Sequence, residues 1–273
     1  MADWETRAVR SDGCRIAYDC RQGEGPEVVL LHGYGLDRTM WAPQLVALEG
    51  WTVLNLDIRG HGDSRPCADF SIPQAAEDLR AVLVKERCRA PVLVGLSMGG
   101  YVVQEYAWQF GGCAGYLVAG ATPILLDCYS GWERAGLRAS TPLLGVWPWR
   151  CLKSAMAMAC SSTEEGRAAV RRMFDQLTRR EFLRGWRGIA QCLHPEKHFS
   201  FDAPLLVCRG ERDRTGTIAR HMEDWKRAWP ETETAVLPGA AHVVNLDAPE
   251  AFNRLLLDFY LAAYCSQKPD HLQ

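Results

Sequence analysis

The sequence has neither a strong net charge nor a long apolar segment. Its 273 residues carry 31 lysines and arginines against 33 aspartates and glutamates, which gives a formal net charge of −2. No basic stripe predicts binding to nucleic acid, and no acidic block predicts a disordered tail. No apolar run reaches the roughly 20 residues that a membrane helix needs. These absences favour a globular protein that acts on a small molecule, with neither nucleic acid nor a membrane as its partner.

Paired cysteine motifs are missing as well, although cysteine itself is frequent. The 11 cysteines are scattered and no two of them form C-x-x-C, so the spacing that a zinc site needs is absent. We interpret them as buried free thiols in a reducing cytosol, and we expect no metal and no organic cofactor. Residues 1–5 contain neither a basic nor an apolar segment. The expectation is therefore no secretory signal and a cytoplasmic location.

Apolar runs of strand length alternate with helical patterns along most of the chain. Continuous apolar runs are typical of strands that are covered on both faces of a sheet. The alternation predicts parallel βαβ units, and therefore an α/β fold with helices on both faces of a mostly parallel sheet. Strands are expected at 27–31, 52–57, 91–95, 115–120, 203–208 and 233–237, with two short ones within 5–20; helices are expected at about 39–48, 71–88, 98–110, 216–229 and 249–264.

The alternation stops at about residue 122 and returns at about residue 202. The segment between is rich in Trp, Met and Arg, and its helical patterns lie near 150–160, 164–178 and 180–192. We interpret 122–201 as a helical cap that is inserted into one α/β core formed by 1–121 and 202–273. A chain of 273 residues is long for one domain, but it suits a domain that carries an insertion.

A serine lies at the junction between the expected strand 91–95 and the helix after it. The local sequence is Gly95-x-Ser97-x-Gly99. Such a turn is sharp and its central residue takes a strained backbone, so side chains two positions to either side would clash. Glycine at both positions removes the clash. The turn would raise the Ser97 hydroxyl above the sheet, beside a helix N-terminus that stabilises negative charge.

Two further residues have the chemistry that such a serine requires. A serine hydroxyl needs a base to take its proton, and the base needs a group that orients it. Asp213 follows the expected strand 203–208, and His242 follows the expected strand 233–237. The carboxyl ends of parallel strands meet at one edge of a sheet, so both should approach Ser97. A structural alternative for Asp213 is a cap of the helix expected at 216–229.

The chain resembles the α/β-hydrolase fold superfamily, in its single-domain branch with a cap. The resemblance extends over nearly the whole chain except the cap, and it implies a twisted sheet of the eight-stranded type. Its motifs are specific for the superfamily but not for a substrate. They are His32-Gly33-Tyr34-Gly35, Asp57-x-Arg59-Gly60-His61-Gly62-Asp63-Ser64, Gly95-x-Ser97-Met98-Gly99-Gly100, Gly210-x-x-Asp213, Gly239-Ala240-Ala241-His242 and Asp247-x-Pro249-Glu250.

The resemblance implies a role for each matching residue. Ser97 would be the nucleophile, His242 the base and Asp213 its orienting acid, and the backbone N–H groups of Tyr34 and Met98 would form the oxyanion hole. The loop that contains His61 and Asp63 mostly braces the fold in this family, and His32 would be structural. The chain departs from the family pattern in two places: Asp247 stands where glutamate is frequent, and arginines flank Asp213 at 212 and 214.

A serine nucleophile favours chemistry that passes through an acyl-enzyme. It argues against the dehalogenases and epoxide hydrolases of the superfamily, which have aspartate at this position. Cleavage of a small carboxylic ester is the leading hypothesis, because it needs the least help with the leaving group. A lactonase, a carbon–carbon bond hydrolase, a cofactor-free lyase or perhydrolase, and a ligand receptor with little turnover remain alternatives.

The substrate pocket should lie between the cap and the nucleophile. Its aromatic residues predict a substrate with an apolar or aromatic part. The candidate lining residues are Tyr34, Leu96, Trp132, Trp147, Trp149 and Trp186.

Overall fold

A single mixed sheet organises the fold, as seen in a computed structural model that describes residues 4–25, 27–195 and 199–265. Its eight strands lie in the order β1-β2-β4-β3-β5-β6-β7-β8. β1 and β2 pair in the antiparallel direction, and β3 to β8 are parallel to one another. This confirms the predicted α/β class. The strands are Glu5–Ser11, Cys14–Arg21, Glu27–Leu31, Thr52–Leu56, Val92–Leu96, Gly115–Ala119, Leu205–Gly210 and Glu233–Leu237.

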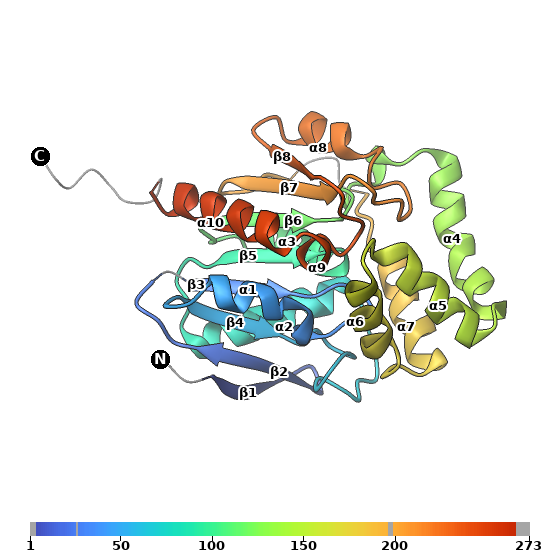
Figure 1. The fold of residues 1–273 in the computed structure, drawn as a ribbon, viewed down its shortest axis with the longest axis horizontal. Coiled ribbons are helices and arrows are strands. Elements are labelled where there is room, and N and C mark those ends of the chain that lie inside the picture. Colours follow the sequence, from blue (N-terminus) through green and yellow to red (C-terminus); the bar gives the residue numbers. More distant parts are fainter. Residues whose placement is uncertain (1–3, 26, 196–198, 266–273) are drawn as a thin grey trace, which may run out of the picture.

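Helices cover both faces of the sheet, which explains why the central strands are rich in apolar residues. α2 and α3 lie on one face, and α1, α9 and α10 lie on the other (Figure 1). Every residue of β4, β5 and β6 is buried. Within the described residues, no helix combines the length and apolarity that crossing a bilayer would take. The helices are α1 Ala42–Ala47, α2 Ile72–Glu86, α3 Met98–Gln109, α8 Met222–Ala228, α9 Val244–Asp247 and α10 Pro249–Cys265.

Helix boundaries follow local signals in some places and differ from them in others. Ser71 caps α2, because its hydroxyl accepts a hydrogen bond from the Gln74 N–H at 3.3 Å, and Pro73 stands in the first turn. The helix expected at 216–229 begins only at Met222. Gly216 has a left-handed backbone with φ +54°, which turns the chain before the helix starts.

In the segment between β6 and β7, the described residues form four α-helices, which lie beyond the carboxyl ends of the strands (Figure 1). α5, α6 and α7 agree with the expected patterns, whereas α4 was not predicted, because Gly136, Pro142 and Gly145 weaken its helical signal. The entry and exit of the segment are adjacent, since the Leu126 N–H donates to the His194 carbonyl at 2.8 Å. The division into core and cap stays a prediction. The helices are α4 Gly131–Val146, α5 Trp149–Cys160, α6 Glu164–Phe174 and α7 Arg179–Ala190.

Residues 1–3, on which the expectation about a secretory signal partly depends, lie outside the described residues.

Candidate active site

The turn at Ser97 joins β5 directly to α3. Ser97 has φ +54°, a left-handed backbone that is costly for any residue with a side chain. A Cβ atom on Gly95 would overlap the Gly99 carbonyl, and a Cβ atom on Gly99 would overlap the Leu31 carbonyl. The two glycines therefore allow the helix to start against the sheet. The sequence-based inference that glycine at 95 and 99 removes a steric clash agrees with this packing.

Asp213 and His242 meet at the same edge of the sheet. Asp213 follows β7 and His242 follows β8, and the His242 Nδ1 atom lies 2.9 Å from the Asp213 Oδ2 atom. Both side chains are buried. The other oxygen of Asp213 accepts the Thr215 N–H at 2.8 Å. Asp213 therefore does not cap the helix that was expected to follow it, since α8 starts only at Met222.

The surroundings of Asp213 keep its carboxyl group ionised. Burial on its own raises the pKa of this group. The charge and hydrogen bond of His242, together with the hydrogen bond from the Thr215 N–H, more than offset the effect of burial, so the pKa lies below its usual value. An ionised carboxylate only accepts hydrogen bonds, so His242 Nδ1 carries the proton that this pair shares.

A cavity of about 270 Å³ brings these elements together. Ser97 and His242 both line it, and so do Tyr34 and Met98. Met98 is the first residue of α3, so its backbone N–H has no acceptor within the helix. A group bound in this cavity would therefore lie against the serine, the histidine and both of the segments that were expected to supply an oxyanion hole.

The tryptophans assigned to the pocket from the sequence do not all reach it. Trp186 lines the cavity, with Tyr34 and Leu96. Trp149 lies outside it and packs against Phe182, with ring centroids 5.2 Å apart.

Trp132 and Trp147 point away from the cavity, which corrects the expectation that they line it. Their side chains are 89% and 46% exposed. Trp132 is in the first turn of α4, a helix in which no residue is buried. The outward face of α4 therefore carries Trp132 to solvent, and the inward face contributes Leu137 to the cavity.

The cavity wall also contains polar groups that sequence reasoning missed. The Tyr101 and Thr122 hydroxyls lie 2.8 Å apart, and the Tyr129 hydroxyl contacts Thr122 and donates to the Pro123 carbonyl at 2.8 Å. Tyr101 lies in α3, whereas Thr122 and Tyr129 lie in the connection between β6 and α4, so no sequence pattern links all three. None of the described residues that line the cavity is Asp, Glu, Lys or Arg.

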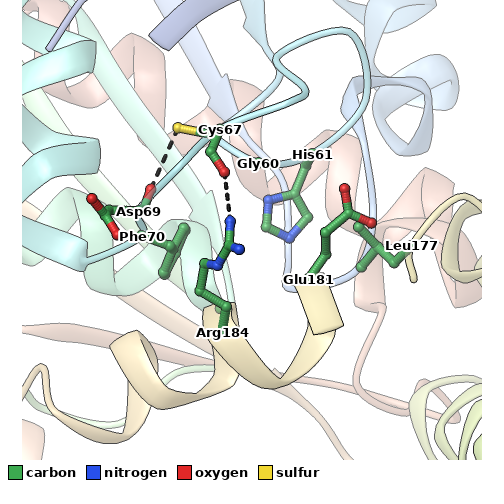
Figure 2. Close-up of a pocket in the computed structure, with 9 residues that line it drawn as sticks. Gly60, His61, Cys67, Asp69, Phe70, Leu177, Glu181 and Arg184 are labelled. Carbon is green, nitrogen blue, oxygen red and sulfur yellow. Dashed lines mark hydrogen bonds between the residues drawn. The ribbon is translucent and has the colours of Figure 1, made fainter. Parts of the chain in front are cut away.

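His32 and His61 lie behind the cavity rather than in it. His32 Nδ1 contacts the Gly33 carbonyl at 2.8 Å, and its Nε2 accepts the Ile58 N–H at 2.9 Å. His61 borders a separate, small cavity together with Glu181 and Arg184 from α7 (Figure 2). Burial lowers the pKa of His32 to about 4 and that of His61 to about 3. Both rings are therefore neutral at physiological pH.

Comparison with known proteins identifies the family to which the chain belongs. The model of the alpha/beta hydrolase family matches residues 28–255. A pimeloyl-[acyl-carrier protein] methyl ester esterase of Yersinia enterocolitica is 26% identical over 249 residues, which cover 87% of this chain and 94% of that protein. The chain belongs to the alpha/beta hydrolase family, and it is a hydrolase.

Solved structures share the fold. A thermophilic esterase from Thermogutta terrifontis aligns with a TM-score of 0.79 at 22% identity, over 96% of this chain and 99% of that one. A hydrolase from Pseudomonas aeruginosa PA01 aligns with a TM-score of 0.80 at 24% identity, over 94% of this chain and 98% of that one.

Proposed function

We propose that the protein is a serine hydrolase that cleaves a small carboxylic ester through an acyl-enzyme. The observation that carries the proposal is the arrangement of three side chains. Ser97 and His242 line one cavity, and the Asp213 carboxylate is hydrogen-bonded to His242 Nδ1 at 2.9 Å. This arrangement supplies a nucleophile, a base and an orienting acid in the roles that acyl transfer requires.

In the first half-reaction, the Ser97 hydroxyl oxygen attacks the ester carbonyl carbon and His242 Nε2 takes the hydroxyl proton. The carbon–oxygen bond to the alcohol then breaks, and the alcohol leaves with the proton from His242. In the second half-reaction, water attacks the acyl carbon and gives a proton to His242. The proton returns to Ser97 and the carboxylic acid leaves. Asp213 keeps Nδ1 protonated, so that Nε2 is free to accept at both stages.

The oxyanion formed in both steps would be bound by backbone N–H groups of Tyr34 and Met98. Both residues line the cavity beside Ser97. The start of α3 adds the positive end of a helix dipole at the same place. Each donor of this kind is worth about 3–4 kcal/mol of the barrier. With these groups the proposed reaction requires neither a metal nor an organic cofactor.

The cavity favours a neutral, largely apolar substrate. Leu36, Met156, Ile189 and Leu193 contribute apolar wall, and none of the described lining residues carries a fixed charge. A charged group buried here would have no ionic partner, which is costly. The volume of about 270 Å³ suits a small ester. The related methyl ester esterase supports an ester over other acyl compounds, and the helices of 122–201 would act as the cap that limits substrate size.

Hydrolysis of a chain-length series of p-nitrophenyl esters tests the proposal, with the wild type beside Ser97→Ala. Ser11→Ala, at the end of β1, serves as the matched serine control. We expect turnover by the wild type and by Ser11→Ala, and a rate near background for Ser97→Ala.

Labelling with a small fluorophosphonate tests the nucleophile independently of the substrate. Labelling at Ser97 without ester turnover would keep the nucleophile and redirect the search to lactones, ketone-activated carbon–carbon bonds or a receptor role. No labelling would overturn the proposal.

A further inference from the structure

The carboxylate of Asp247 joins two segments that are far apart in the sequence. Asp247 is the last residue of α9, five positions after His242. It accepts hydrogen bonds from the loop that carries His242 and from Ser161, Ser162 and Thr163, which lie between α5 and α6. We call residues 160–163 the α5–α6 junction.

The junction wraps around the carboxylate. The Ser161 hydroxyl donates to Asp247 Oδ1 at 2.6 Å, and the Ser162 N–H and hydroxyl donate to Oδ2 at 2.8 and 3.0 Å. A Thr163 hydroxyl contact at 3.3 Å adds to them. The junction has room for this arrangement because residue 166 is glycine, where a Cβ atom would overlap the Ser161 hydroxyl and lie 3.0 Å from Asp247 Oδ1.

The same carboxylate holds the peptide next to the histidine. The Ala241 N–H donates to Asp247 Oδ2 at 2.8 Å. On the other side of His242, the Val243 N–H donates to the Cys160 carbonyl at 2.9 Å. The chain is therefore fixed immediately before and after His242. One of these bonds goes to Asp247, and the other goes directly to the α5–α6 junction.

We propose that Asp247 is a positioning residue for His242, and that the α5–α6 junction is part of the support that orients the base. The inference rests on the proposed function, since it assigns the support of the same Ser97, His242 and Asp213 site. Asp247 does not touch the reacting atoms. It acts by fixing the backbone from which His242 reaches both Asp213 and the cavity, and a displacement of about 1 Å at such a site can cost about 100-fold in rate.

A purely structural brace would have a different signature. If Asp247 only stabilised the fold, its loss would lower the fraction of folded protein and leave the folded enzyme at its normal rate. If it positions the base, the folded enzyme itself would be slow, with kcat lowered and KM nearly unchanged.

The test compares Asp247→Ala and Asp247→Glu with the wild type. The control is Asp175→Ala, which removes a carboxylate at the C-terminal end of α6 that pairs with Lys153 instead of with the loop that carries His242. The readouts are kcat and KM on the best p-nitrophenyl ester, the rate of Ser97 labelling by a small fluorophosphonate, the Tm, and the low-field proton resonance of His242 Nδ1–H.

For Asp247→Ala we expect kcat and the labelling rate to fall together by about 10- to 100-fold, with KM within about twofold. The Nδ1–H resonance should shift or broaden. Asp247→Glu should recover part of the rate, and Asp175→Ala should match the wild type. Normal kcat and normal labelling in folded Asp247→Ala would overturn the proposal.

A second variant covers the case in which Asp247→Ala does not fold. Replacing Ser161 and Ser162 with alanine removes two of the three hydroxyl donors and keeps the carboxylate, its bonds to the Ala241 and Ser162 N–H groups and the Thr163 hydroxyl contact. We expect a smaller loss of labelling rate, about three- to tenfold, and an unchanged rate in the folded double variant would count against the proposal. Failure of the wild type itself to label at Ser97 would instead overturn the proposed function.

Discussion

Asp213 and His242, 29 positions apart, share a hydrogen bond of 2.9 Å in which the imidazole donates to a carboxylate without exposed side-chain surface. The bond fixes both the tautomer and the direction of the ring. The ring also packs on Gly120, where a Cβ atom would come within 3.2 Å of Cε1 and Nδ1. The position of His242 is therefore determined by contacts on two sides, which suits the proposed role of this ring as a base.

Replacing Asp213 with asparagine should keep the shape of the site and remove most of its activity. The amide can donate to Nδ1, which stabilises the opposite tautomer and puts the proton on the nitrogen that must accept it. We expect kcat to fall by about 10³- to 10⁴-fold with a small change in KM, measured on the best p-nitrophenyl ester. A far-UV spectrum like that of the wild type is the control. Retention of a tenth of the activity would contradict the role given to Asp213.

His61 should make the stability depend on pH below about 6.5. Burial and the neighbouring His32 lower the pKa of His61 to about 3, from an ordinary value of 6.5. Between these values the unfolded chain binds a proton that the folded chain does not, so stability is full above pH 6.5 and is lost as pH falls toward the folded value. The loss is about 1.4 kcal/mol per pH unit for one such group.

Urea unfolding of the wild type and His61→Asn at pH 4.5, 5.5 and 7 measures this contribution. The asparagine amide can donate to the Arg59 carbonyl in place of Nδ1, which lies 3.0 Å from it. The variant should lose about 1.4 kcal/mol less per pH unit than the wild type below pH 6, since its other titrating groups are the same. Parallel pH profiles of the two proteins would contradict the assignment of a neutral buried ring.

The sheet and the placement of the three candidate site residues could be predicted because each depends on a local sequence pattern. The topology of a parallel sheet then brings the ends of the strands together at one edge. The parallel strands are rich in apolar residues, and the residues after β5, β7 and β8 share one sheet edge in any parallel sheet. The prediction that Ser97, Asp213 and His242 lie at one edge of the sheet therefore required no knowledge of side-chain packing. The glycines at 95 and 99 were explained by close backbone approach, which the structure shows.

The pocket could be predicted only in part, because helix rotation decides which side chains face inward. Trp132 and Trp186 look equivalent in sequence, yet α4 turns Trp132 to solvent and α7 turns Trp186 into the cavity. The contacts of Asp247 with Ser161 likewise join segments 86 positions apart. No periodicity encodes such contacts, since they depend on how the four helices between β6 and β7 sit on the sheet.

A close contact between α7 and the loop after β3 predicts that Gly185→Ala is harmful. A Cβ atom at residue 185 would lie 2.7 Å from the Tyr34 ring, and the Tyr34 hydroxyl donates to the Phe182 carbonyl on the same helix. The methyl group would push Tyr34 or α7 away, so we expect a loss of about 1–3 kcal/mol in the free energy of unfolding. The displaced Tyr34 N–H should also lower kcat.

Gly136→Ala is the matched control for this substitution. It also replaces a glycine inside one of the helices between β6 and β7, but no described atom beyond the neighbouring helix backbone lies within 4 Å of the Cβ position. Alanine in a helix interior should stabilise the protein by about 0.5–1 kcal/mol, with kcat unchanged. Urea unfolding and ester kinetics on both variants check the pair. Equal effects of the two substitutions would exclude the contact with Tyr34 as the cause.

Substrate length should depend on Trp186 and not on Trp132. Trp186 lines the cavity, where its indole N–H donates to the Ser140 hydroxyl at 2.7 Å. Leucine at 186 would keep an apolar wall and vacate the space of the indole ring, so longer acyl chains should fit. Each additional methylene that enters an apolar pocket changes kcat/KM by about 10- to 200-fold. We therefore expect the ratio of kcat/KM for the octanoate ester to that for the acetate ester to rise by at least about 10-fold in Trp186→Leu.

The same substitution at Trp132 removes an equally large side chain that is 89% exposed, so Trp132→Leu should leave this ratio within about twofold of the wild type. Trp186→Phe separates the two properties of the indole, because phenylalanine keeps an aromatic wall and loses only the hydrogen bond to Ser140. If the hydrogen bond from Trp186 to Ser140 of α4 sets the size of the cavity, Trp186→Phe should raise the octanoate-to-acetate ratio as Trp186→Leu does. If the volume of the ring sets it, Trp186→Phe should keep the ratio of the wild type. An unchanged preference in all three variants would mean that the acyl chain occupies another part of the cavity, away from Trp186.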